Sequence, residues 1–169
     1  NWTRYNIDPN FNDAEDVFNL LGPDFAIGGE AESAIVKLAD VLSKEKPSPC
    51  IIKAEVTDIS KLPFPDYEPF GIQDMIDNYS DFTRMLYRYS RPYPRPFSIV
   101  ASRSCPFTCT FCIHNRRGIP YRARSIESIM EEIRVTYEKY HFNILILLDE
   151  LFAVSKGRMN DFSDGVLEG

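Results

Sequence analysis

The pattern of apolar and polar positions predicts short strands and helices separated by irregular segments. A short extended run at 23–27 is followed by the turn Gly28-Gly29 and then by a helix. The apolar residues of this helix recur at helical spacing and are Ala34, Ile35, Leu38, Ala39, Val41 and Leu42. A strand, a glycine turn and a helix in this order form the basic unit of an open α/β sheet.

Prolines set the pattern between residues 44 and 96, where they fix extended or turn geometry and prevent long regular elements. A short strand at 50–52 and a helical turn or two at 72–79 fit between them. Arginine and aromatic side chains then alternate from 79 to 97. This mixture is typical of a segment packed between two domains, which we favour, and also of a surface for single-stranded nucleic acid.

After residue 96 the pattern becomes that of a parallel α/β unit. A β-prone run at 96–102 leads into a loop, and Ser125 can cap a helix with apolar positions at helical spacing and Glu131 and Glu132 on its other side. The apolar run 142–148 predicts a parallel strand buried on both faces. Such a crossover is the opening unit of a parallel barrel, and residues 156–169 are expected to be a frayed end.

Composition and charge narrow the class of protein. The chain has 44% hydrophobic and 26% charged residues, which is ordinary for a globular chain that buries a core. A net charge of −6 argues against a nonspecific nucleic-acid binder. No apolar run approaches a membrane span, no signal peptide opens the chain, and we expect a cytoplasmic protein. The missing initiator Met and the abrupt last residues indicate a piece of a longer protein.

The candidate chemistry lies in a loop where three of the four cysteines fall within eight positions, at Cys105, Cys109 and Cys112. Thiolates select iron–sulfur clusters, zinc or copper(I), and Pro106 argues against a continuous helix. Zinc sites and ordinary 4Fe-4S clusters use four protein ligands, so three cysteines would leave one iron open to a substrate. His114 offers an alternative, a Cys3His zinc site, and three unrelated thiols are the plainest reading.

Several further residues have two interpretations. Arginines near the loop either offset the negative charge of a thiolate-bound cluster or pair with acids across the rim of the barrel, and we favour a mixture of the two without assigning either role to a particular residue. They are Arg103, Arg116, Arg117, Arg122 and Arg124. Cys50, far from the loop, is expected to be a buried structural thiol.

The spacing Cys-x3-Cys-x2-Cys, with Phe111 before the last cysteine, resembles the signature loop of the radical S-adenosylmethionine (SAM) enzymes. The resemblance implies that Cys105, Cys109 and Cys112 hold a 4Fe-4S cluster and that Phe111 packs beside the adenine of SAM. In that family the open iron binds SAM, and one electron cleaves it to methionine and a 5'-deoxyadenosyl radical. An electron donor such as flavodoxin or ferredoxin is implied as a partner.

Residues 24–32 resemble the last strand and glycine turn of the cobalamin-binding domains that precede the radical SAM domain in one subclass. In those domains the glycines, here Gly28 and Gly29, lie against the nucleotide tail of cobalamin. The Asp-x-His-x-x-Gly segment that supplies a cobalt ligand in some relatives is absent. Residues 62–67 resemble the linker that follows such a domain.

The sequence Asp149-Glu150-Leu151-Phe152 follows the last predicted strand and resembles the Asp-Asp-x-Phe phrase of cobalamin-type radical SAM enzymes. The resemblance implies that Asp149 or Glu150 accepts a hydrogen bond from the ammonium of SAM. The plain alternative is a solvated strand end.

The predicted fold is therefore α/β and incomplete. It comprises the end of a Rossmann-like cobalamin-binding domain at 1–46, a proline- and aromatic-rich linker at 47–95, and the first β-α-β unit of a partial TIM-type barrel at 96–169. The resemblance implies a radical SAM enzyme fragment for methyl transfer or radical rearrangement, on a small-molecule, lipid or natural-product substrate that the sequence does not identify. The alternative is a zinc-stabilised binding module, with the arginine and aromatic linker contacting a partner or RNA.

Overall fold

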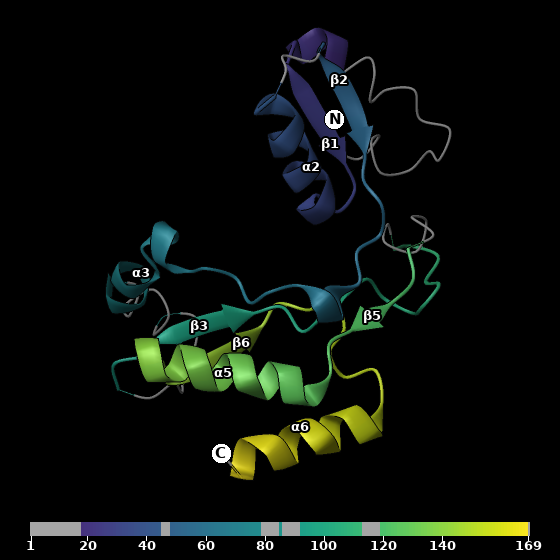
Figure 1. Cartoon of the computed structure of the whole chain (residues 1–169). Helices are drawn as coiled ribbons and strands as arrows, with labels where there is room; N and C mark the ends of the chain where they lie inside the picture. Colours follow the sequence, from purple (N-terminus) through teal and green to yellow (C-terminus); the bar gives the residue numbers. More distant parts are fainter. Residues whose placement is uncertain (1–17, 45–47, 79–84, 86–91, 113–118, 169) are drawn as a thin grey trace. The chain divides into compact units, whose positions relative to one another are not determined.

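The computed structural model describes residues 18–44, 48–78, 85, 92–112 and 119–168, and shows a mixed α/β chain with small parallel sheets (Figure 1). It divides into two compact units. The first comprises the residues up to Asp58 together with Pro106–Pro120, and the second comprises Ile59–Cys105 and Tyr121–Gly169. The module limits after residues 46 and 95 stay a prediction, because compactness does not test the family resemblance on which they rest.

The first unit is a parallel strand pair with one crossover helix. β1 (Phe25–Gly28) pairs with β2 (Cys50–Lys53), and α2 (Glu32–Leu42) lies between them in the chain. Gly29 turns the chain at a φ of 104°, and a Cβ atom there would lie 3.4 Å from the carbonyl oxygen of Ala54. The turn therefore needs glycine at position 29, and the predicted strand, turn and helix are confirmed.

The second unit repeats this plan. β3 (Pro96–Ile99) pairs in parallel with β6 (Ile144–Leu147), and α5 (Ile126–Tyr140) connects them and packs along the pair (Figure 1). Ser125 caps α5 as predicted, since its side chain accepts a hydrogen bond from the N–H of Ser128 at 3.2 Å. Each residue of β6 is half-buried, so the expectation that both faces of this strand are buried is wrong.

An aromatic cluster forms the centre of the second unit. The ring of Phe97 stacks on Phe142 at 4.9 Å and on Tyr140 at 5.7 Å, while Tyr67 meets it edge-on at 4.9 Å. Tyr67 thus packs the proline-rich segment against the sheet. In its described part that segment includes the short 3₁₀ helices η2 (Ile59–Lys61) and η3 (Glu68–Phe70) and the α-helix α3 (Ile72–Asn78).

The last helix was not expected. α6 (Lys156–Glu168) replaces the predicted frayed end and packs next to α5 (Figure 1). Ser155 accepts a hydrogen bond from the N–H of Arg158 at 3.2 Å, and Phe162 meets Phe152 edge-on at 4.9 Å. These tertiary contacts outweigh the low helix propensity of the two glycines in the segment.

A small antiparallel ribbon also escaped prediction, because strands of two residues leave no periodic signal. β4 (Ser102–Arg103) pairs with β5 (Arg122–Ala123) and so joins the two ends of the segment that carries the three cysteines. Across the described ranges, no helix has the length and apolar character needed to cross a membrane.

Candidate functional site

The three clustered cysteines lie on an irregular loop, and none of them is in a disulfide. Cys105 and Cys112 are half-buried and Cys109 is exposed. A turn forms where the N–H of Cys112 donates to the carbonyl oxygen of Cys109 at 3.0 Å, and the ring of Phe111 is 91% exposed. Cys50 is also free and exposed, so the prediction of a buried structural thiol at this position is wrong.

The donor chemistry of this loop fits a three-thiolate iron–sulfur site, because cysteine thiols on a short irregular loop, outside disulfides, are the ligands that such clusters use. Within the described part of the chain, no three His, Cys, Asp or Glu side chains gather closely enough to hold a metal. Metal binding often orders its own ligands, so thiols that do not converge in the metal-free chain can still form the site. The rival ligand His114 lies outside the described residues, as do Arg116 and Arg117.

Asp149, one of the two acids predicted to contact SAM, lies beside the stretch that leads into Cys105. Its Oδ1 accepts a hydrogen bond from the N–H of Ala101 at 2.7 Å, and its Oδ2 accepts one from the hydroxyl of Ser102 at 2.6 Å. The neighbouring Glu150 is exposed. The structure therefore brings Asp149 to residues 101–104, the segment that leads into Cys105 and that we call the base of the cysteine loop. Both carboxylate oxygens of Asp149 have protein partners there.

A buried polar cluster of Arg124, Glu132 and Tyr67 lies near the same base. Arg124 pairs with Glu132, and its guanidinium also donates to the carbonyl oxygen of Val100 at 3.3 Å. The hydroxyl of Tyr67 donates to Glu132 Oε1 at 2.8 Å. The pKa of the Tyr67 hydroxyl is raised well above its ordinary value. Burial is the largest cause, and the hydrogen bond to the Glu132 carboxylate is the second.

Two sequence predictions are settled by this cluster. Arg124 follows the second interpretation of the loop arginines, because it pairs with an acid of its own unit. Glu132 was placed on the polar side of its helix, and that is wrong, since only 1% of it is exposed. Arg124 and Glu132 are eight positions apart in the sequence, and α5 begins between them. No local sequence pattern therefore indicates that they form a pair.

The glycine turn lies at the carboxyl ends of β1 and β2. The carbonyl oxygen of Gly28 accepts a hydrogen bond from the N–H of Ala54 at 2.9 Å. A Cβ atom placed on Gly28 would meet nothing within 4 Å, so this side of the turn is open, whereas Gly29 lies close to the backbone. Carboxyl ends of parallel strands are where open α/β sheets bind ligands.

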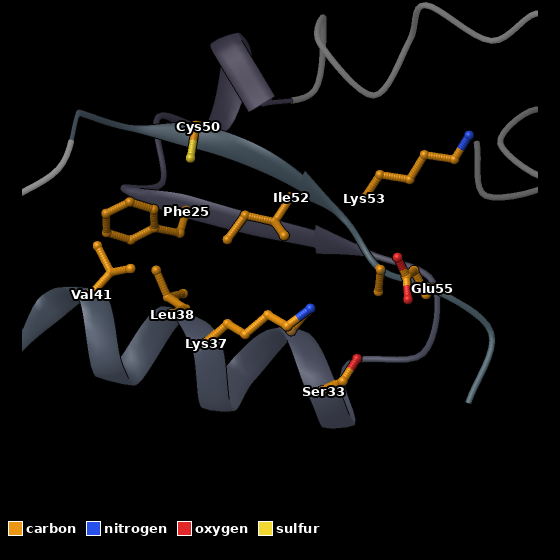
Figure 2. A pocket seen from close by; sticks show the side chains of 11 residues that line it. Phe25, Ser33, Lys37, Leu38, Val41, Cys50, Ile52, Lys53 and Glu55 are labelled. Atoms are coloured by element: carbon orange, nitrogen blue, oxygen red, sulfur yellow. The ribbon is translucent and has the colours of Figure 1, made fainter. Parts of the chain in front are cut away.

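A cavity of about 260 Å³ lies between α2 and the strand pair of the first unit. Figure 2 shows that Ser33, Lys37 and Glu55 lie toward the carboxyl ends of the strands, while Phe25 and Val41 lie at the opposite end. The polar lining is therefore on the side of the glycine turn. Sequence reasoning found the turn but not this cavity, since its lining comes from three separate elements.

No protein-family model matches the chain, and no solved structure matches it. Over 146 residues it is 29% identical to an uncharacterised methyltransferase of Pyrococcus horikoshii, a match that covers 83% of this chain and 31% of that protein. Over 67 residues it is 28% identical to the anaerobic magnesium-protoporphyrin IX monomethyl ester cyclase of Rubrivivax gelatinosus, which covers 40% of this chain and 12% of the cyclase. The chain thus spans less than a third of the length of these two relatives, and both carry the names of enzymes.

Proposed function

We propose that the chain is part of a radical SAM enzyme and that Cys105, Cys109 and Cys112 hold a 4Fe-4S cluster. The observation that carries the proposal is the set of three cysteines at this spacing on one irregular loop, none of them in a disulfide. When bound, such a cluster supplies one electron to SAM and offers it an open iron site. The name of the Pyrococcus horikoshii relative favours methyl transfer over radical rearrangement as the reaction class.

The described side chains near the loop have separate tasks in this proposal. The three thiolates bind the metal, and the exposed ring of Phe111 packs against the adenine of SAM. The exposed carboxylate of Glu150 accepts a hydrogen bond from the SAM ammonium. In architectural terms, β3, α5 and β6 are the first unit of a TIM-type barrel over residues 96–169, a barrel type that carries its chemistry at the carboxyl ends of its strands.

We propose that residues 1–46, which carry β1, the glycine turn and α2, are the end of a Rossmann-like cobalamin-binding domain, with residues 47–95, which carry β2, as the linker. The fit is partial. The open side of Gly28 suits contact with a nucleotide tail, but the described part of the first unit has two strands and so supplies one border of such a site. Gly28 would touch the ligand, while Gly29 would shape the turn.

Anaerobic reconstitution with iron and sulfide tests the metal proposal. We expect about four irons per chain, visible charge-transfer absorbance, and an EPR signal after reduction that changes when SAM is added. Serine in place of Cys105, Cys109 or Cys112 should abolish the cluster. Cys50→Ser is the matched control and should retain it, because this thiol lies outside the loop.

The opposite result would be zinc retention without a cluster. If that retention were lost in His114→Ala, the zinc-stabilised binding module would replace the radical SAM proposal. Binding of neither metal by the chain or by a longer form of the protein would remove both proposals.

A further inference from the structure

The backbone just before Cys105 is held from both sides. The N–H of Ala101 donates to Asp149 Oδ1 at 2.7 Å, and its carbonyl oxygen accepts from the N–H of Arg124 at 2.9 Å. The next hydroxyl, that of Ser102, donates to Asp149 Oδ2 at 2.6 Å. Ala101 and Ser102 are 0% and 2% exposed, so water does not compete effectively for these bonds.

The sheet fixes the position of Asp149 itself. The N–H of Leu148 donates to the carbonyl oxygen of Ile99 at 3.0 Å, which continues the pairing of β3 and β6 up to the residue before Asp149. The carboxylate then bonds a segment 48 residues away in the chain. Because the acceptor is charged, these two hydrogen bonds belong to the stronger class.

The path from this anchor to the first thiol is short. Ser102 and Arg103 form β4, and Ser104 then adopts a φ of 67°, in the left-handed region, immediately before Cys105. A residue other than glycine keeps such a conformation only when its surroundings hold it. The direction in which the chain enters the cysteine loop therefore depends on the strand that Asp149 holds.

We propose that Asp149 is a positioning residue for Cys105 and not a ligand of SAM. Its carboxylate holds residues 101–103 in place so that Cys105 leaves the sheet in a fixed direction. This inference rests on the proposed function of the cysteine loop as a metal site. Supporting side chains of this kind commonly control how well first ligands hold a metal.

Two substitutions at one position separate the two roles. Asp149→Asn keeps one acceptor for Ala101 and a polar group for Ser102 but removes the charge that a SAM ammonium would need. Asp149→Ala removes all of these. The readouts in the metal-free chain are amide hydrogen exchange at Ala101, followed by NMR, and the alkylation rate of Cys105, followed by peptide mass spectrometry.

For Asp149→Ala we expect exchange at Ala101 to become about ten- to a hundredfold faster, the range that a hydrogen bond to a charged group represents. Alkylation of the half-buried Cys105 should also accelerate, and a reconstituted cluster should lose its iron faster. Asp149→Asn keeps a neutral acceptor for Ala101, so it should change these readouts less than Asp149→Ala does, and it should keep the EPR response to SAM. Glu150→Ala is the control for exchange at Ala101, which it should leave unchanged.

Two results would overturn the inference. The first is slow exchange and normal iron retention in Asp149→Ala. The second is an Asp149→Asn protein that keeps the cluster but loses its response to SAM, which is the behaviour of a direct ligand. If Asp149→Ala does not fold, Ser102→Ala keeps the Oδ1 bond to Ala101 and removes the Oδ2 bond, together with the longer bond of the same hydroxyl to the carbonyl oxygen of Leu151 at 3.3 Å. It should give a smaller effect in the same direction. If no cluster assembles in the unmodified chain, the proposed function fails, while exchange and alkylation still decide whether Asp149 holds the base of the loop.

Discussion

Removing the charge of Glu132 should destabilise the second unit more than its place on a helix suggests. The side chains of Arg124 and Glu132 are 10% and 1% exposed, so both charges have left water. Breaking a buried ion pair by removing one partner costs about 3 to 5 kcal/mol, whereas exposed pairs are worth about 0 to 1 kcal/mol. Glu132→Gln keeps the size of the side chain and leaves the arginine charge uncompensated.

The structure places the expected cost at the lower end of that range. Arg124 keeps hydrogen bonds to the carbonyl oxygens of Val100, at 3.3 Å, and Ser128, at 3.0 Å, so its charge is not left without partners. We therefore expect a loss of about 3 kcal/mol in the free energy of unfolding. With a urea dependence of about 2 kcal/mol per molar, the midpoint should fall by about 1.5 M.

Urea unfolding followed by circular dichroism and tyrosine fluorescence measures this shift. The matched control is Glu131→Gln on the same helix, because Glu131 is exposed and pairs with Arg134, an exposed arginine. Its midpoint should stay essentially unchanged. The double variant Arg124→Met with Glu132→Leu should recover much of the lost stability, since apolar side chains of similar volume often replace a buried ion pair well. Equal midpoints for the Glu132→Gln and Glu131→Gln proteins would refute the reasoning.

Four further substitutions test other parts of the structure. Because the pKa of Tyr67 is raised in the folded chain, its neutral hydroxyl stabilises the fold fully below the ordinary tyrosine pKa of about 10, and this contribution is lost as the pH rises above that value. Urea unfolding should therefore show stability falling as the pH is raised from about 9, and the fall should be smaller in Tyr67→Phe. Gly29→Ala should destabilise the first unit by about 1 kcal/mol or more because of its positive φ, whereas Gly28→Ala should fold normally and weaken cobalamin binding measured by equilibrium dialysis. Ser125→Ala should cost about 1 kcal/mol in thermal unfolding through loss of the helix cap, and an unchanged melting temperature would contradict the observed hydrogen bond.

Local patterns predicted the parts of the fold whose determinants are local. The helix after the glycine turn was predictable from its apolar spacing, and the helix after Ser125 from its apolar spacing together with the capping residue. α6 was missed because two glycines lower its intrinsic propensity, and the contacts that offset this come from Phe152 and from α5. The local sequence pattern of residues 156–168 does not indicate that Phe152 and α5 pack against this segment.

The same division runs through the candidate site. The three cysteines were recognisable because their chemistry depends on spacing within eight residues. The residues that hold the neighbouring backbone in place come from far along the chain, since Asp149 bonds a strand 48 residues away and Glu132 bonds Tyr67 across 65 residues. Both acids looked like solvent-facing or ligand-facing groups until their partners were known. It follows that the motif and its support are separable. The same eight residues moved to another loop would keep three thiols at the right spacing, yet they would lose the anchored strand that directs Cys105, and we expect such a graft to bind metal less tightly than this chain.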